Sequence, residues 1–202
     1  MNIDPASGKV ILVTGAAKSG KSEWAETLAH KSGKSVFYVA TAKVDTSEAA
    51  QGSLPENDDS VDREWLLRIE QHRHRRPCEW VTLEVPHNLV ETIKSTPDSC
   101  CLLVDSLGTW VANLLESDNT TWERTQENLI FNLEQVGNKD VIIVAEETGW
   151  GVVPAYSSGR LFRDRLGNLV RRLGAIANPV YLVAGGHVLN LSTLGFPLPV
   201  KR

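Results

Sequence analysis

Short apolar runs rich in β-branched residues recur along the 202-residue chain, and stretches with the period of a helix separate most of them. A strand that is covered on both faces carries apolar residues at consecutive positions rather than at alternate ones. Runs of this kind predict strands at residues 9–14, 35–40, 80–84, 100–105, 140–145 and 179–184.

Two segments between these runs place apolar residues three or four positions apart, which is the spacing of an amphipathic helix that packs on a sheet. Their apolar positions are Trp122, Leu129, Ile130, Leu133 and Val136 in the first, and Phe162, Leu166, Leu169, Val170, Leu173 and Ile176 in the second. Strands that alternate with helices are typical of an α/β fold with a mainly parallel sheet and helices on both faces.

The length of the chain predicts a single domain over residues 1–202, since two full-sized domains need more residues. Within it, residues 45–62 are polar, acidic and rich in residues that break helices and strands. We expect this segment to form a mobile surface loop rather than a linker between domains.

Charge restricts the class of partner. The net charge of -4 and the pI near 5.8 give no electrostatic reason to bind nucleic acid or an anionic membrane. We therefore expect a small-molecule partner.

The cysteines and the N-terminal segment indicate the compartment. Cys100 and Cys101 are adjacent, cannot easily bridge each other and lie in an apolar run, which together with Cys78 is the pattern of reduced thiols. The apolar stretch near the N-terminus, residues 10–13, is shorter than a signal-peptide core or a membrane span. Both observations predict a cytoplasmic protein.

A phosphate-binding loop is predicted between the first strand and a helix at residues 21–30. The motif G-x-x-x-x-G-K-[ST] starts at Gly15, and its second glycine is Gly20. In such a loop, backbone N–H groups surround phosphate oxygens, and the following helix adds the positive end of its dipole. We expect nucleotide contacts from Gly15, Ala16, Ala17, Lys18, Ser19, Gly20, Lys21 and Ser22.

Three side chains supply the charge and the metal ligands that this chemistry needs. Lys21 is expected to reach the β and γ phosphates, and the Ser22 hydroxyl to ligate Mg²⁺. Asp105 closes a buried strand, where a second oxygen ligand for Mg²⁺ is expected. Asp105 or Ser106 equally suits the N-cap of the helix that follows, and the two roles of Asp105 are compatible.

Residues 68–80 form the densest cluster of cationic and titratable side chains in the chain. A neutral histidine can attack phosphorus and carry it as a phosphoramidate, while neighbouring arginines hold the phosphates. His72 and His74 are the candidates. The alternative is a solvated basic end of a helix, where these side chains offset the helix dipole before Pro77. Composition alone favours this alternative.

Five groups of motifs follow one another in a fixed order from Val10 to about Gly186. They are residues 11–22; residues 38–42; Arg68-Ile69 followed by His72, Arg76-Pro77 and Trp80; Asp105 followed by Trp110 and residues 113–115; and residues 147–154 followed by Arg160, residues 162–164 and Gly167. In this order they resemble the bifunctional adenosylcobinamide kinase/adenosylcobinamide-phosphate guanylyltransferase family of cobalamin biosynthesis. A phosphate loop by itself indicates only a nucleotide.

The resemblance implies two reactions in sequence. ATP or GTP first phosphorylates the hydroxyl of the aminopropanol arm of adenosylcobinamide. A histidine then takes GMP from GTP, releases pyrophosphate, and passes the GMP to the new phosphate to give adenosylcobinamide-GDP. The backbone contacts of a phosphate loop are blind to the base, so ATP and GTP both remain candidates for the first donor.

The resemblance also implies roles for residues and an assembly. His72 occupies the guanylylated position, counted back from Arg76-Pro77, which makes His74 the less favoured nucleophile. A RecA-like parallel sheet and a homo-oligomer, in the form of a trimer, are further implications. The nucleotide contacts carried over besides the phosphate loop are Thr41, Ala42, Lys43, Arg73, His74, Arg75, Arg76, Glu84 and Asp105.

The chain departs from the family pattern near its fifth strand and in its last long helix. Glu146 stands where the family usually has asparagine, and residues 168–171 read Asn-Leu-Val-Arg where many members have Asn-Gln. Residues 147–154 predict a loop at the edge of the sheet that holds the site, serving either the site itself or only as a turn.

Two alternative functions follow from a phosphate loop without the family resemblance. One is a P-loop kinase of another small metabolite that lacks guanylyltransferase activity. The other is a RecA-like module that binds nucleotide and single strands, against which the acidic pI argues.

Overall fold

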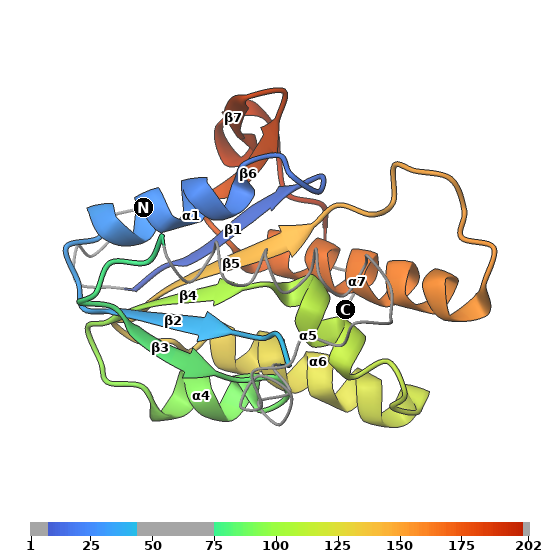
Figure 1. Ribbon diagram of the computed structural model, residues 1–202, viewed down its shortest axis with the longest axis horizontal. Helices are drawn as coiled ribbons and strands as arrows, with labels where there is room; N and C mark the ends of the chain where they lie inside the picture. Colours follow the sequence, from blue (N-terminus) through green and yellow to red (C-terminus); the bar gives the residue numbers. More distant parts are fainter. Residues whose placement is uncertain (1–7, 44–74, 200–202) are drawn as a thin grey trace, which may run out of the picture.

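The computed structural model describes residues 8–43 and 75–199, so the predicted loop 45–62 lies outside the described residues. Its strands form a seven-stranded sheet in the order β3-β2-β4-β5-β1-β6-β7 (Figure 1). Neighbouring strands are parallel, except that β6 and β7 are antiparallel. The strands are β1 (Val10–Gly15), β2 (Val36–Ala40), β3 (Val81–Glu84), β4 (Cys101–Asp105), β5 (Asp140–Glu146), β6 (Val180–Ala184) and β7 (His187–Asn190).

The six predicted strands are all present, and each observed end lies within one residue of the predicted one. Strand β7 is an addition that the apolar pattern does not predict, because it is short and mostly exposed. Gly185 and Gly186 form the two-residue turn before it, with φ of 58° and 75°, and Ala184 pairs with His187 across the turn. Two consecutive positive φ angles are those of a type I′ hairpin turn, which favours glycine.

Helices cover both faces of the sheet (Figure 1). Helix α1 (Lys21–Lys31) lies on one face, and α4 (Leu89–Ser95), α5 (Leu107–Asn113), α6 (Asn119–Leu133) and α7 (Ser157–Ile176) lie on the other. A single turn, α8 (Leu191–Leu194), follows β7. Helix α7 confirms the second amphipathic segment. Helix α6 confirms the first up to Leu133, and Val136, which was expected in the same helix, lies beyond its end but still packs against the core. Within the two described ranges, no helix combines the length and the apolar character needed to cross a membrane.

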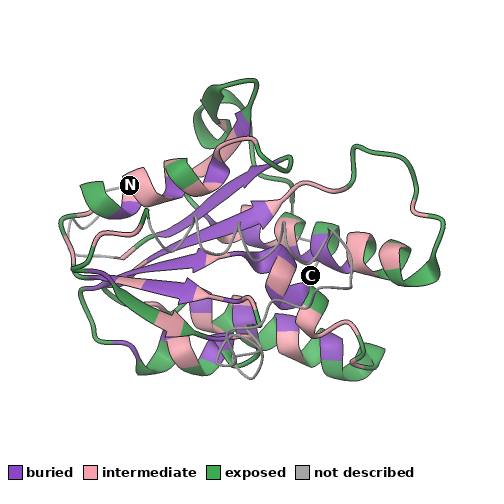
Figure 2. Ribbon diagram, viewed as in Figure 1, coloured by how far each residue is buried: buried purple, intermediate pink, exposed green. Residues whose placement is uncertain are grey.

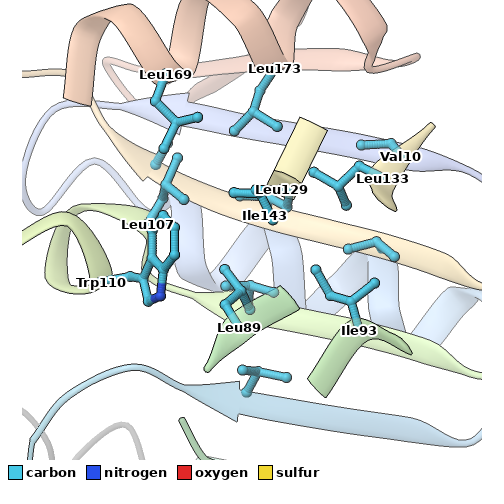
Figure 3. Packing of buried hydrophobic residues seen from close by; sticks show 14 of the residues in the cluster. Val10, Leu89, Ile93, Leu107, Trp110, Leu129, Leu133, Ile143, Leu169 and Leu173 are labelled. Atoms are coloured by element: carbon cyan, nitrogen blue, oxygen red, sulfur yellow. The ribbon is translucent and has the colours of Figure 1, made fainter. Parts of the chain in front are cut away.

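Two hydrophobic clusters, one on each face of the sheet, explain the continuous apolar runs of the sequence. On β5, Ile142 and Val144 pack toward α1, whereas Val141 and Ile143 pack toward the helices on the opposite face. Figure 2 shows the central strands as almost entirely buried. Trp110 of α5 is the largest fully buried side chain and belongs to the larger cluster, which Figure 3 shows from close by.

The carboxyl ends of the parallel strands meet at one edge of the sheet, where α/β proteins bind their ligands. Strands β1 to β5 end there with Gly15, Ala40, Glu84, Asp105 and Glu146. Strand β5 lies between β1, which leads into the phosphate loop, and β4, which ends at the predicted metal ligand. The predicted fold class, an α/β P-loop fold with a mainly parallel sheet flanked by helices, is confirmed.

Candidate nucleotide site

The phosphate loop joins β1 directly to α1. A Cβ atom on Gly15 would overlap the Val183 carbonyl oxygen and lie 2.7 Å from Ser19 Oγ, so only glycine fits at the end of β1. Gly20 is the N-cap of α1 with a φ of 93°, a conformation that other residues rarely adopt. Because a glycine cap brings no side-chain acceptor, it leaves the first turn of the helix open to an anion.

Lys21 begins α1 and lies along the loop rather than in solvent. The residue is only 3% exposed, and its Nζ donates a hydrogen bond to the Ala16 carbonyl oxygen at 3.2 Å. The ammonium group is therefore held inside the curve of the loop, the region in which phosphate loops bind β and γ phosphates.

Ser22 and Asp105, the two predicted metal ligands, come together from α1 and β4. The Ser22 hydroxyl donates to Asp105 Oδ1 at 3.4 Å, and the Tyr38 hydroxyl donates to Asp105 Oδ2 at 2.6 Å. Burial and, next, the negative charge of Asp105 raise the pKa of Tyr38 above its ordinary value, which keeps the phenol protonated as a donor. Each oxygen of the carboxylate thus faces a hydroxyl group.

These oxygen donors fit Mg²⁺. In nucleotide sites this ion takes one or two protein oxygens, retains several waters, and completes its shell with phosphate oxygens. Ser22 and Asp105 provide such a pair beside the phosphate loop. The donor set is therefore chemically suited to Mg²⁺, and the metal role of these two residues stays a prediction.

The N-cap of α5 is Ser106, not Asp105. The Ser106 side chain accepts a hydrogen bond from the Thr109 N–H at 3.4 Å, and the peptide bond between Asp105 and Ser106 is cis. Of the two candidates for the cap, the structure selects Ser106, so that the Asp105 carboxylate is directed to Ser22 and Tyr38 instead.

Thr41, a predicted nucleotide contact, is fully buried and bonded within the protein. Its hydroxyl donates to the Ser106 carbonyl oxygen at 2.7 Å and accepts from the Ser106 N–H at 2.9 Å, while its own carbonyl oxygen accepts from Asn113 at 2.8 Å. The hydroxyl hydrogen and one of the two lone pairs of the hydroxyl oxygen are thus used within the protein. Ala42 and Lys43 follow it at partly buried and exposed positions.

The described part of the cationic segment begins at Arg75 and lies against α1 and β2. Arg75 forms ion pairs with Glu23 at 3.2 Å and Glu26 at 3.4 Å, both on the first two turns of α1. The guanidinium carbon of Arg76 lies 3.6 Å from the centroid of the Tyr38 ring. The structure thus brings the two arginines close to the phosphate loop. The predicted residues His72, Arg73 and His74 lie outside the described residues.

Glu84 ends β3, the outermost strand on this side of the sheet. It is exposed at the end of β3 and pairs in register with Ala40 of β2. Because β2 separates β3 from β4, Glu84 and Asp105 are not neighbours at the edge of the sheet. Glu84 therefore borders the site from the outer strand.

Glu146 places a further carboxylate at the edge of the sheet that holds the site. The sequence analysis notes this residue only because it departs from the family pattern. It ends β5, pairs in register with Gly15, and accepts a hydrogen bond from the Gly108 N–H of α5 at 2.9 Å. A Cβ atom on Gly108 would overlap the Glu146 carboxylate. An acidic residue at the end of a buried strand is the signal by which the sequence identifies Asp105, and Glu146 at the end of β5 carries the same signal.

Residues 147–156 form a loop that projects from the body of the protein between β5 and α7 (Figure 1). Arg160 braces it by donating to the carbonyl oxygens of Pro154 at 3.0 Å and Ala155 at 2.6 Å. Trp150 and Tyr156 are 70% and 80% exposed. The loop therefore presents large aromatic side chains to the surroundings from the edge that carries the phosphate loop.

Comparison with known proteins gives one family match over most of the chain. The model of the CobU family, described as cobinamide kinase / cobinamide phosphate guanyltransferase, matches residues 11–191. The bifunctional adenosylcobalamin biosynthesis protein CobP of Pseudomonas aeruginosa is 34% identical over 192 residues, which cover 94% of this chain and 96% of the relative. The protein CobU of Escherichia coli strain K12, named in the same way, is also 34% identical, over 88% of this chain and 96% of the relative.

Two of the solved structures that match this chain are only distantly similar to it. The match to the flagellar accessory protein FlaH from Methanocaldococcus jannaschii covers 91% of this chain and 76% of the FlaH chain, with 16% identity and a TM-score of 0.47. The match to the RadB recombinase covers 88% of this chain and 74% of the recombinase chain, with 19% identity and a TM-score of 0.42. Likeness of this degree carries no information on substrate or reaction.

Proposed function

Because this chain belongs to the cobinamide kinase / cobinamide phosphate guanyltransferase family, we infer that it is a bifunctional enzyme of adenosylcobalamin biosynthesis. It phosphorylates adenosylcobinamide and then converts the product to adenosylcobinamide-GDP. The observation that carries this inference is the family match over residues 11–191, which starts in β1 and ends in α8. Its substrates are accordingly nucleoside triphosphates and a corrinoid.

In the kinase reaction, the substrate hydroxyl attacks the γ phosphorus of ATP or GTP, and the nucleoside diphosphate leaves. We assign Gly15 to Ser22 to hold the triphosphate, with Lys21 neutralising charge on the transferred group. The contact between Lys21 Nζ and the Ala16 carbonyl oxygen supports this assignment, because it orients the ammonium along the loop before nucleotide binds. A pre-oriented charge loses little freedom when the phosphates arrive.

In the guanylyltransferase reaction, we assign His72 as the nucleophile. Its neutral ring nitrogen attacks the α phosphorus of GTP, pyrophosphate leaves, and a phosphoramidate to GMP forms. An oxygen of adenosylcobinamide phosphate then attacks the same phosphorus, which breaks the P–N bond and forms the diphosphate. Arg73, His74, Arg75 and Arg76 are proposed to neutralise the phosphates in this reaction.

The contacts of Arg75 support the proposal that one nucleotide site serves both reactions. Arg75 is paired with Glu23, the residue that follows Ser22 of the phosphate loop. Three residues of extended chain span at most about 11 Å, which limits how far His72 can lie from Arg75. The chain length is therefore compatible with attack by His72 on a nucleotide bound at the loop.

Ser22 and Asp105 are proposed to hold Mg²⁺, since their oxygen atoms meet beside the loop. The bound ion supplies Lewis-acid stabilisation of charge on the phosphate oxygens. Ser22 offers its hydroxyl as a ligand, and Asp105 accepts from it and orients it. Glu84, Thr41, Ala42 and Lys43 are proposed as further contacts to the nucleotide from the neighbouring strand ends.

A homo-oligomer, in the form of a trimer, is proposed for the assembly from the family resemblance. The exposed side chains of Trp150, Val152 and Tyr156 on the projecting loop support a surface that another copy covers, because isolated chains rarely expose so much apolar area in one segment. We also propose that the enzyme acts in the cytoplasm, where its three free cysteines remain reduced. Sedimentation equilibrium tests the trimer, and a monomer at micromolar concentration contradicts it.

The test of the two activities is incubation of the protein with adenosylcobinamide, GTP and Mg²⁺, followed by liquid chromatography and mass spectrometry. We expect adenosylcobinamide phosphate first and adenosylcobinamide-GDP later. Repeating the reaction with ATP as the only nucleotide identifies the kinase donor. Phosphorylation of the corrinoid without any GDP-linked product, on protein that binds GTP, contradicts the guanylyltransferase assignment.

The nucleophile is tested on the protein itself. Incubation with GTP and Mg²⁺, without the corrinoid, is expected to add one guanylyl group to the intact chain, which is the mass of GMP less one water, with the release of pyrophosphate. His72→Ala removes this adduct, whereas the matched variant His74→Ala retains it. The opposite pattern assigns the nucleophile to His74 and overturns the proposal for His72.

A further inference from the structure

Tyr38 is a buried polar residue at the candidate site to which no role has been assigned. It lies in the middle of β2 and is 1% exposed. Its hydroxyl reaches the end of the neighbouring strand β4 and donates to Asp105 Oδ2 at 2.6 Å. The side chain thus connects the interior of the α1 face with the predicted metal ligand.

Packing alone does not account for a tyrosine at this position. A phenylalanine ring fills the same volume, whereas a buried hydroxyl costs free energy unless it forms a hydrogen bond. The bond to Asp105 satisfies the hydroxyl, and a donor to a charged acceptor makes a stronger bond than a neutral pair. The hydroxyl therefore stabilises one orientation of the carboxylate.

That orientation is the one a metal site needs. With Oδ2 facing Tyr38, the other oxygen Oδ1 faces the Ser22 hydroxyl at 3.4 Å. A carboxylate that is bonded on one side cannot rotate away from Ser22 without losing that bond. Groups behind a metal ligand commonly set its orientation in this way, and removing them weakens metal binding.

The ring of Tyr38 is held independently of its hydroxyl. Arg76 covers one face of the ring, with the guanidinium carbon 3.6 Å from the centroid, and donates to Thr82 Oγ1 at 3.5 Å. Such a cation above an aromatic ring attracts it electrostatically. A phenylalanine at position 38 retains this contact, so that the loss of the hydroxyl can be separated from the loss of the ring.

We propose that the Tyr38 hydroxyl is a positioning group that holds the Asp105 carboxylate in the orientation required to bind the metal ion at Ser22. This proposal rests on the proposed function, because it assumes that Ser22 and Asp105 hold Mg²⁺ with a nucleotide. It adds a residue that acts through Asp105 and does not touch the substrate or the ion.

The test is the affinity for Mn²⁺, a spectroscopic substitute for Mg²⁺, in the presence of a non-hydrolysable GTP analogue. Electron paramagnetic resonance counts the free ion directly and does not depend on turnover. Tyr38→Phe is expected to weaken Mn²⁺ binding about 10-fold, the lower end of the effect of removing a group behind a metal ligand. An affinity equal to that of the unaltered protein overturns the proposal.

Tyr181→Phe is the matched control. Tyr181 lies in β6 on the same face of the sheet and packs edge-on against Trp24, with ring centroids 5.6 Å apart. Removing its hydroxyl changes a tyrosine to phenylalanine near α1 but away from Asp105. We expect Mn²⁺ affinity to stay unchanged, and an equal loss in both variants overturns a specific role for Tyr38.

Action through Asp105 is tested with a double-mutant cycle. If the hydroxyl of Tyr38 acts only by orienting the carboxylate, then Tyr38→Phe has no further effect on Mn²⁺ affinity once Asp105→Asn has removed the charge. If Tyr38→Phe lowers the Mn²⁺ affinity by the same factor with and without Asp105→Asn, the proposal is overturned. Thermal unfolding of each variant verifies that the protein is folded.

A measurement on the unaltered sequence covers the case in which Tyr38→Phe does not fold. The chain has three tyrosines, so 3-fluorotyrosine labelling gives three fluorine resonances, which Tyr156→Phe and Tyr181→Phe assign. Mg²⁺ added with the nucleotide analogue is expected to shift the Tyr38 resonance beyond the shift that the analogue causes alone. A Tyr38 resonance that does not respond to the ion overturns the proposal.

The two proposals fail in different ways. A protein that binds Mn²⁺ with the GTP analogue but forms no corrinoid product contradicts the proposed reactions and leaves the metal measurement valid. A protein that catalyses both reactions, but whose Tyr38→Phe variant binds Mn²⁺ normally, contradicts only the role of Tyr38.

Discussion

The hydroxyl of Thr41 forms two hydrogen bonds with the backbone of Ser106, donating to its carbonyl oxygen at 2.7 Å and accepting from its N–H at 2.9 Å. Thr41 follows β2 and Ser106 follows β4, so the pair ties two neighbouring strand ends together at the edge of the site. The turn that carries Asp105 into α5 is thereby fixed by a side chain from another strand.

We predict that Thr41→Val destabilises the protein by about 1–3 kcal/mol, because the valine keeps the volume but leaves a buried N–H without its acceptor. Thr41→Ser, which retains the hydroxyl, should lose less. Urea unfolding followed by circular dichroism measures both. Thr120→Val at an exposed position is the control, with a change within about 0.5 kcal/mol. Equal stability of Thr41→Val and the control contradicts the role of this bond pair.

The sequence predicts those site residues that belong to a short motif or that end a recognisable strand. Gly15, Gly20 and Lys21 belong to one short motif, and Asp105 is marked by the buried strand that it ends. The apolar runs define the strands because both sheet faces are covered, which makes consecutive positions apolar.

The sequence does not predict which helices and strands come into contact, or the hydrogen bonds between them. The bond from Tyr38 to Asp105 depends on β2 lying next to β4, and the bond from Gly108 to Glu146 depends on α5 packing beside the end of β5. Hydrophobic periodicity defines the elements but contains no strand order. The same limit applies to Thr41, whose partner Ser106 is 65 positions away in the sequence.

Gly108 and Gly167 provide a matched pair of helical glycines with opposite surroundings. A Cβ atom on Gly108 in α5 would overlap the Glu146 carboxylate, whereas one on Gly167 in α7 would meet no atom within 4 Å. Alanine is a better helix former than glycine by about 0.5–1 kcal/mol. We therefore predict that Gly167→Ala stabilises the protein by roughly that amount.

Gly108→Ala is predicted to be less stable than Gly167→Ala by about 1–2 kcal/mol, because Glu146 must give up the hydrogen bond that it accepts from the Gly108 N–H. Urea unfolding of the two variants measures the difference. Adding Glu146→Ala to Gly108→Ala removes the overlap and should recover part of the loss. Identical stabilities of the two single variants contradict the contact between α5 and Glu146.

The three cysteines are predicted to differ in reactivity. Burial raises the pKa of Cys101 to about 12 and also raises that of Cys100, whereas Cys78 is exposed. The thiolate is the reactive form, so the higher pKa and the lack of access both slow the reaction of the buried pair at pH 8. Iodoacetamide should modify one thiol of the native chain within minutes, and mass spectrometry counts the additions.

Cys78→Ser should abolish this fast addition, while unfolding in urea should expose all three thiols of the parent chain. Two or more fast additions to the native protein contradict the burial of Cys100 and Cys101. Cys78 itself lies in the cationic segment, residues 68–80, so its fast modification reports that this part of the segment is accessible to solvent.

Lys21 carries the prediction that bears most directly on catalysis. Its ammonium is already held at the loop by the Ala16 carbonyl oxygen, so Lys21→Ala removes a positioned charge from the phosphate that is transferred. Loss of one positioned group that stabilises transition-state charge typically costs about 100-fold to 1,000-fold in rate. We expect a loss of this size in phosphorylation of the corrinoid, measured at saturating nucleotide. Lys31→Ala, at the exposed far end of α1, is the matched control and should retain the parent rate.

Because the nucleophile of the second reaction attacks the α phosphorus, GMP adduct formation should fall less than phosphorylation in Lys21→Ala. If Lys21→Ala phosphorylates the corrinoid at the parent rate, the assignment of Lys21 is contradicted, whatever happens to the rate of adduct formation.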